Sequence, residues 1–315
     1  MTTRAVVGFL ALQPFVVLAA SKVYREKHRP QLPLSRFLDL HNKSVLVTGA
    51  SSGIGKATLL ELKKLGATVV TGGRHGGDFH LDLSDMKSVE RFTRAVKEKE
   101  GVPDLILSCA AEIYCGDPEG ANPDLSADGY DATFATNALG LQALLRGFEG
   151  EDKQPEKVVI VASKLERQGI VDPEVIRETR GRRMNRREGN FEAVKNYADS
   201  KLCNQLLATT LAERWKNTKV FSVSPGMVDT GLWRNFPPWF QTITKPVRAV
   251  ALRTPEDAAL GVIFALAAED MEGVESGSFL VDGKVEDCSA AGRDKEKGRR
   301  LWDVCEELIG DALER

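Results

Sequence analysis

The chain has 315 residues, 42% of them hydrophobic and 28% charged, which is enough for one large α/β domain with a sizeable core. Its formal net charge of −2 at pH 7 argues against general nucleic-acid binding. The five cysteines and four histidines have neither the spacing of a zinc site nor that of a disulfide framework. We therefore expect no bound metal and a reducing compartment.

The N-terminal 20 residues contain an uncharged apolar segment, 5–20, with several basic residues directly after it. The segment contains Pro14 and is shorter than the roughly 20 residues of a usual transmembrane helix. It fits a short membrane anchor, a cleaved signal peptide with a small-residue site at 18–21, or an apolar helix that packs on the protein or enters one leaflet. Because the basic residues follow the apolar run, we favour an anchor at 1–20 with the rest of the chain on the cytosolic side.

Residues 21–40 predict a tether, because two prolines interrupt any helix, and a single folded domain is expected over 41–315. The domain opens with a short apolar strand at 43–48, which runs directly into Thr-Gly-Ala-Ser-Ser-Gly-Ile-Gly at 48–55. Apolar residues at helical spacing follow the glycines. A strand, a glycine turn and a helix in this order form the first unit of a dinucleotide-binding fold.

The glycine turn is expected to hold the pyrophosphate of a dinucleotide. Gly49 would permit a tight turn, Gly53 the close approach of the phosphates and Gly55 the close packing of the helix on the strand. The amide groups and the positive dipole end at the helix N-terminus would complete the site. The residues predicted to contact the cofactor here are Gly49, Ser51, Ser52, Gly53, Ile54 and Gly55.

Strands and helices alternate through the rest of the domain. Strands are predicted at 68–71, 79–83, 105–108, 158–163, 219–224 and 278–282, and helices at 86–99, 129–146, 193–215, 255–268 and 295–308. This alternation predicts a single Rossmann-type doubly wound parallel sheet with helices on both faces. Cofactor and substrate should meet at the carboxyl ends of its strands.

The second strand is followed by glycines and Arg74, and then almost at once by the third strand, so the crossover between them is shortened. NAD-selective folds usually present an acid at the end of this strand, whereas a guanidinium can pair with a 2′-phosphate. We therefore expect NADP(H) in preference to NAD(H). The alternatives are a solvated Arg74 and a role for Asp78 as the acid.

Tyr197 and Lys201 lie four positions apart and so share one face of the predicted helix 193–215. The ammonium favours the phenolate, which predicts a tyrosine pKa lowered from about 10 toward the range of an acid–base catalyst. Each pattern alone is common. A glycine turn after the first strand, followed later by this pair, indicates a nicotinamide-dependent oxidoreductase.

Together these motifs, Thr-Gly-x-x-x-Gly-x-Gly and Tyr-x-x-x-Lys, resemble the short-chain dehydrogenase/reductase family. The run Tyr-Ala-Asp-Ser-Lys-Leu-Cys-Asn at 197–204 and the C-terminal segments 299–302 and 308–310 resemble its retinol dehydrogenase branch. They resemble the light-dependent protochlorophyllide reductase branch nearly as well. The resemblance covers the chain from about residue 40 to the C-terminus.

The resemblance implies further site residues. Ser163 would orient the substrate carbonyl, and Asn137 would hold a water in a proton relay to Lys201. Asp82 would contact the adenine ring, and Ala110 would approach the cofactor through its backbone. The segment that closes over the nicotinamide would supply Pro225, Gly226, Val228 and Thr230. As an alternative, Ser163 could simply cap a turn at the end of its strand.

Two segments beyond these motifs bear on substrate access. The run 232–240 holds four aromatic residues and two prolines, and predicts either a lid for an apolar substrate or a loop packed on the core. The insertion 164–196 separates Ser163 from Tyr197 by 34 positions, as an insertion does in the retinol dehydrogenase branch. Its arginines predict a solvated basic loop, with attraction to anionic lipid as the alternative.

These observations predict an NADP(H)-dependent oxidoreductase for a small apolar carbonyl or alcohol of retinoid or lipid type, with Tyr197 as general acid–base. The branch implies attachment to the endoplasmic reticulum membrane with a cytosolic catalytic domain; a soluble protein or another organelle membrane are the alternatives. A protochlorophyllide-reductase-like enzyme is a second hypothesis, although Met227 replaces that branch's characteristic cysteine. A catalytically idle cofactor-binding scaffold is the third, because Ser-Cys-Ala-Ala at 108–111 replaces the family's Asn-Asn-Ala-Gly.

Overall fold

The computed structural model describes residues 37–116, 124–150, 153–186 and 192–315. The expected membrane anchor lies outside these ranges, as does the tether up to residue 36. The last residues of the expected tether contact the domain, since the Leu38 amide donates to the Ala267 carbonyl (2.8 Å) and Leu40 is buried. Within the described part of the chain, no helix has the length and apolar character needed to cross a membrane.

Eight strands form a sheet in the order β3-β2-β1-β4-β5-β6-β7-β8. Every neighbouring pair is parallel except β7 and β8. The central strands β4 and β5 are buried along their whole length, because helices cover both faces of a parallel sheet. The strands are β1 (Ser44–Thr48), β2 (Thr68–Gly73), β3 (Phe79–His80), β4 (Leu105–Ser108), β5 (Lys157–Val161), β6 (Lys219–Ser224), β7 (Phe279–Val281) and β8 (Lys284–Glu286).

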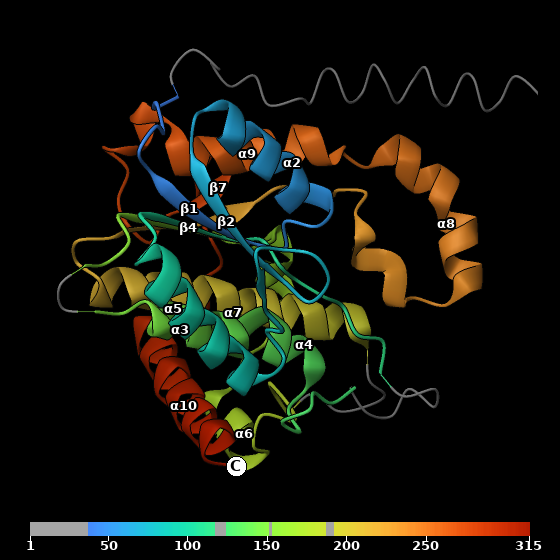
Figure 1. Ribbon diagram of the computed structural model, residues 1–315. Coiled ribbons are helices and arrows are strands. Elements are labelled where there is room, and N and C mark those ends of the chain that lie inside the picture. Colours follow the sequence, from blue (N-terminus) through green and yellow to red (C-terminus); the bar gives the residue numbers. More distant parts are fainter. Residues whose placement is uncertain (1–36, 117–123, 151–152, 187–191) are drawn as a thin grey trace, which may run out of the picture.

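Helices lie on both faces of this sheet, as predicted (Figure 1). One face is covered by α2 (Gly53–Lys64) and α9 (Pro255–Ala267). The opposite face is covered by α3 (Met86–Glu100), α5 (Gly140–Gly147), α7 (Ala193–Arg214) and α10 (Lys295–Glu314). Three shorter or peripheral helices complete this part of the fold: α4 (Ala132–Phe134), α6 (Pro173–Glu178) and α8 (Pro238–Ala251).

Each face of the sheet has its own apolar core. Alternate residues of a strand point to opposite faces, so Val45 and Val47 pack with α9, whereas Leu46 between them packs with the helices of the other face. On that second face α10 is buried against α7 through residues such as Leu301 and Leu308. The two cores hold the carboxyl ends of the strands in place, and the site described below lies at that edge.

The structure differs from the predicted elements in several places, and one of them is the antiparallel edge strand β8, which was not predicted. The third strand ends at His80, because Leu81 and Leu83 turn into the core. The crossover between β2 and β3 is short and contains no helix, as predicted. The insertion after β5 contains a 3₁₀ helix at 164–168 and α6, whose Arg177 pairs with Glu307 of α10 (2.9 Å) while remaining 43% exposed. The aromatic segment expected to be irregular forms a 3₁₀ turn at 231–235 and the start of α8.

Candidate active site

The glycine turn connects β1 to α2 with a geometry that side chains would prevent. Gly49 has φ +73°, and a Cβ at this position would lie 2.7 Å from the Ala110 amide nitrogen. A Cβ on Gly55 would lie 2.3 Å from the Gly49 carbonyl oxygen. The turn therefore packs backbone against backbone, which brings the N-terminus of α2 up to the carboxyl ends of β1 and β4.

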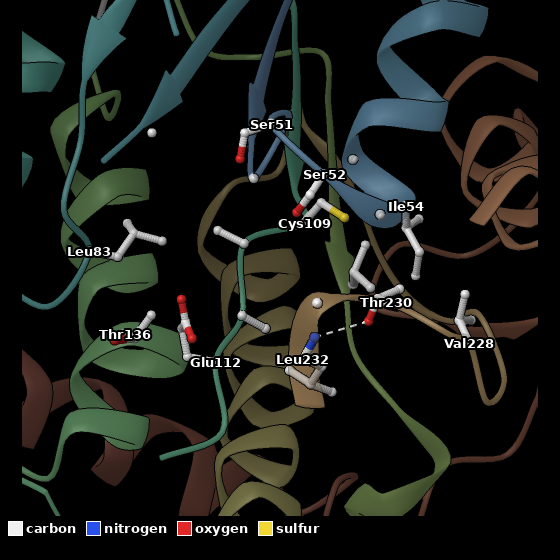
Figure 2. Close-up of a pocket in the computed structure, with 18 of the residues that line it drawn as sticks. Ser51, Ser52, Ile54, Leu83, Cys109, Glu112, Thr136, Val228, Thr230 and Leu232 are labelled. Carbon is white, nitrogen blue, oxygen red and sulfur yellow. Dashed lines mark hydrogen bonds between the residues drawn. The ribbon is translucent and has the colours of Figure 1, made fainter. Parts of the chain in front are cut away.

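The N-terminus of α2 fits a pyrophosphate. Ser52 at the N-cap makes no side-chain hydrogen bond to the first turn, and that turn contains no acidic residue. The first amide groups therefore keep the partial positive charge that binds anions at helix N-termini. Figure 2 shows Ser51 and Ser52 above the pocket, with Ile54 and Thr230 to one side.

One pocket of about 230 Å³ collects nearly all of the predicted site residues. The exception among them is Asn137, whose neighbour Thr136 lines the pocket instead. The predicted residues that line it are Gly49, Ser51, Ser52, Gly53, Ile54, Gly55, Arg74, Asp82, Ala110, Ser163, Tyr197, Lys201, Pro225, Gly226, Val228 and Thr230. They come from the segments that follow β1, β2, β3, β4, β5 and β6 and from helix α7, at the edge where doubly wound sheets bind ligands.

The helix α7 presents Tyr197 and Lys201 on one face, as their spacing predicts. The Lys201 ammonium lies 5.3 Å from the centroid of the Tyr197 ring, and both side chains are buried. Lys201 Nζ donates to the Val161 carbonyl (2.9 Å) at the end of β5 and to Asn204 Oδ1 (3.0 Å). Two of its three protons are thus held by the protein itself.

Burial perturbs the pKa of both groups. Desolvation lowers the pKa of Lys201 to about 8, although nearby Cys109 acts in the opposite direction. Desolvation also raises the pKa of Tyr197 well above its ordinary value, and Cys109 adds to this rise. The prediction of a lowered tyrosine pKa is therefore wrong for the protein alone, because burial removes the hydration that a phenolate would need.

Ser163 follows the last residue of β5 and takes the N-cap position of the 3₁₀ helix 164–168. Its Oγ accepts a hydrogen bond from the Leu165 amide (3.2 Å), so the capping role considered as an alternative is present. A hydroxyl has one proton to donate in addition to its acceptor lone pairs. Capping therefore leaves Ser163 able to donate toward the pocket that it lines.

Asn137 lies in a π-helical turn, Ala135–Leu139, between α4 and α5. Its side chain bonds to both backbone groups of Glu112, accepting from the amide (2.9 Å) and donating to the carbonyl (2.8 Å). Its own carbonyl accepts from Asn204 Nδ2 (2.5 Å). The water relay through Asn137 stays a prediction, whereas the side-chain amide of Asn204 connects Asn137 to Lys201 directly. Sequence reasoning missed this role, although Asn204 lies one helical turn after Lys201.

Arg74 reaches across the pocket from the end of β2. It forms an ion pair with Glu112, and its Nη1 lies 3.4 Å from the Tyr114 hydroxyl. Glu112 is only 6% exposed and also binds Arg234 and Asn235. No pattern in the sequence indicated this carboxylate, because its partners are distant along the chain. Figure 2 shows Glu112 facing the pocket below Ser51.

The other acids near the second strand are occupied by local hydrogen bonds. Asp78 Oδ2 accepts from the Thr71 amide (2.9 Å) and hydroxyl (2.8 Å), and Asp78 is not among the residues that line the pocket. Asp82 does line the pocket, and its Oδ1 accepts from the Ser84 amide (2.9 Å). At the end of β2, Arg74 is therefore the charged side chain that reaches the pocket, and Asp78 is not.

The segment after β6 covers one side of the pocket. Thr230 Oγ1 accepts from the Leu232 amide (3.4 Å), an interaction drawn in Figure 2. The helix α8 that follows projects away from the sheet (Figure 1), with Trp239 and Ile243 each about two-thirds exposed. This exposure excludes the interpretation of the aromatic segment as a loop packed on the core.

Known proteins provide a test of the resemblance. A family model described as short chain dehydrogenase matches residues 43–172. Mouse retinol dehydrogenase 14 is 29% identical over 86% of this chain and 87% of its own length. The human dehydrogenase/reductase SDR family member 13 is 30% identical over 86% and 74% of the two chains. Wheat protochlorophyllide reductase A is also similar, at 26% identity over 98% of this chain and 91% of its own.

Among solved structures, the 3-alpha-hydroxysteroid dehydrogenase from Pseudomonas sp. B-0831, complexed with NADH, superposes with a TM-score of 0.58. It is 25% identical and covers 76% of this chain and 94% of its own. These matches agree with the glycine turn, the strand order and the Tyr197–Lys201 pair on α7. The chain therefore belongs to the short-chain dehydrogenase/reductase family of nicotinamide-dependent oxidoreductases, and is similar to its retinol dehydrogenase branch.

Proposed function

We propose that this protein is an NADP(H)-dependent oxidoreductase that interconverts an apolar carbonyl compound and its alcohol, with a substrate of retinoid or lipid type. The observation that carries this proposal is the position of Tyr197 and Lys201 in the same pocket as the glycine turn. The similarity to mouse retinol dehydrogenase 14 supports the substrate class.

In the reductive direction, the hydroxyl groups of Ser163 and Tyr197 would hydrogen-bond the carbonyl oxygen of the substrate. A bound nicotinamide supplies the hydride. Tyr197 then gives its proton to the oxygen, and its raised pKa means that the hydroxyl is protonated before the transfer. Lys201 keeps its ammonium oriented through Val161 and Asn204, so that its remaining proton is available to re-supply the tyrosine.

The preference for NADP(H) rests on Arg74. It stands at the end of β2, where a 2′-phosphate on the adenosine ribose would lie if the dinucleotide runs along the glycine turn. Its guanidinium can pair bidentately with a phosphate. Asp78, the rival acid for the ribose hydroxyls, is held by Thr71.

The test uses the full chain with NADPH and NADH and a panel of apolar aldehydes, followed through nicotinamide absorbance. We expect turnover with NADPH, and a loss of 100-fold or more in Tyr197→Phe, on the order of what a positioned acid–base group contributes. Tyr130→Phe removes a buried hydroxyl that bonds the Leu308 carbonyl and does not line the pocket, so it controls for stability.

Other outcomes would favour the remaining hypotheses. Cofactor binding without turnover on any aldehyde, in light or darkness, would favour the idle scaffold. Light-dependent reduction of added protochlorophyllide would favour the protochlorophyllide-reductase-like activity, which the similarity to the wheat enzyme supports. Absence of binding to either cofactor would overturn the role of the glycine turn.

We also propose that residues 5–20 attach the protein to a membrane, with the catalytic domain in the cytosol. The uncharged composition of the segment and the basic residues after it support this. The full chain should sediment with membranes after carbonate washing, and a chain lacking residues 1–20 should not. Equal partitioning of the two chains would refute the anchor.

A further inference from the structure

A single buried carboxylate connects three parts of the active site. Glu112 follows β4, is 6% exposed, forms ion pairs with Arg74 and Arg234, and accepts a hydrogen bond from Asn235 Nδ2 (3.1 Å). Its backbone is held on both sides by the side chain of Asn137. Glu112 is therefore fixed in place by contacts other than the one to Arg74.

In this structure, Glu112 binds the Arg74 guanidinium, which is the group proposed to bind the 2′-phosphate. Burial lowers the pKa of Arg74, but the nearby charges of Glu112, Tyr114 and Asp82 raise it above its ordinary value, so the guanidinium stays charged. A phosphate dianion and a carboxylate would compete for the same donors.

We infer that Glu112 is a specificity-determining residue for the cofactor, which competes with the 2′-phosphate for Arg74 and so limits the preference for NADP(H) over NAD(H). This inference rests on the proposed NADP(H) dependence. When Arg74 leaves Glu112 and pairs with the 2′-phosphate, Glu112 keeps its contacts with Arg234 and Asn235. The carboxylate is therefore not left as a buried charge without a partner. NAD(H) offers no competing phosphate, so its binding leaves the ion pair intact.

The experiment is a double-mutant cycle on Arg74→Gln and Glu112→Gln in the full chain. The probes are adenosine 2′,5′-bisphosphate and adenosine 5′-monophosphate, which differ only in the 2′-phosphate. Their dissociation constants are measured by calorimetry, and their ratio is the discrimination. The monophosphate corrects for any general effect of removing a negative charge near the pocket.

We expect Glu112→Gln to raise the discrimination by about tenfold, on the order of one hydrogen bond to a charged group. In the Arg74→Gln background the same change should alter it by less than about twofold, because the shared guanidinium is absent. Glu112→Asp, which keeps the charge but shortens its reach, should also raise the discrimination, and it serves as the second variant if the glutamine chain does not fold.

Three results would overturn the inference in different ways. If Arg74→Gln removes the discrimination but Glu112→Gln and Glu112→Asp leave it unchanged, Glu112 does not compete and the NADP(H) proposal stands. A tenfold rise in both backgrounds would mean that Glu112 acts through its general field. If all the chains bind the two nucleotides equally, the NADP(H) proposal fails as well.

Discussion

Replacing Lys201 with Met removes an ammonium that α7 buries beside Tyr197. The fully buried side chain has a pKa lowered from the ordinary 10.5 to about 8 by loss of hydration. At about 1.4 kcal/mol for each pH unit, holding this charge inside the fold costs about 3 kcal/mol at neutral pH. Met has a similar length and no charge, so the variant does not carry this cost.

The sign of the pH dependence follows from proton counts. Between pH 8 and 10.5 the folded protein binds fewer protons at Lys201 than the unfolded chain does. Its free energy of unfolding should therefore rise with pH through this window, relative to that of Lys201→Met. Below pH 8 the full cost is present, and above 10.5 it is absent. The unpaired Val161 and Asn204 acceptors in the variant add only a constant offset.

Urea unfolding followed by circular dichroism at pH 7.5, 8.5, 9.5 and 10.5 measures the difference. Across this range, we expect the free energy of unfolding of wild type to rise by about 3 kcal/mol relative to that of Lys201→Met. Lys63→Met is the matched control, because Lys63 is exposed on α2 and its ammonium stays in water. A gap that stays constant within about 0.5 kcal/mol would refute the burial argument.

Further predictions concern the turn, the network and the C-terminal helix. Gly49→Ala should destabilise the fold by about 2–5 kcal/mol, because Gly49 has a positive φ and an added Cβ would overlap backbone atoms. Gly310→Ala in α10 has open space around it and should stabilise the fold slightly. Thermal melts of the two variants compare these effects. Asn204→Asp adds a carboxylate at Lys201 and should move the alkaline limit of activity to higher pH; an unmoved limit would exclude that contact. Tyr130→Phe removes the buried hydrogen bond from the Tyr130 hydroxyl to the Leu308 carbonyl, which stays within α10, and should cost about 0.5–1.5 kcal/mol in urea unfolding; no loss would show that this bond is dispensable.

The local parts of this protein were predictable from sequence. The strand at β1, the turn and α2 follow from an apolar run and from glycines, whose backbone angles and close contacts other residues cannot adopt. The shared face of Tyr197 and Lys201 follows from helical spacing. The bounds of β6 were also predicted in full, because it is a short stretch rich in β-branched and aromatic residues between polar ends.

Other features depend on residues far apart in the chain, and only the tertiary structure decided them. Glu112 meets Arg74 and Arg234 because the turns after β2, β4 and β6 converge at one edge of the sheet. No pattern of spacing records that convergence. The helix α8 was also missed, since its aromatic residues and prolines are typical of a loop.

The pKa of Tyr197 shows the same division. Sequence placed an ammonium on the same helix face, and from that pair alone a lowered pKa follows. The structure raises it, because the phenol is enclosed by the pocket walls as well as by its own helix. Sequence by itself determined that Tyr197 and Lys201 share one helix face, since short-range backbone geometry sets their spacing. The burial of a side chain depends on contacts with many distant parts of the chain. Only the tertiary structure therefore decided in which direction the pKa values of Tyr197 and Lys201 shift.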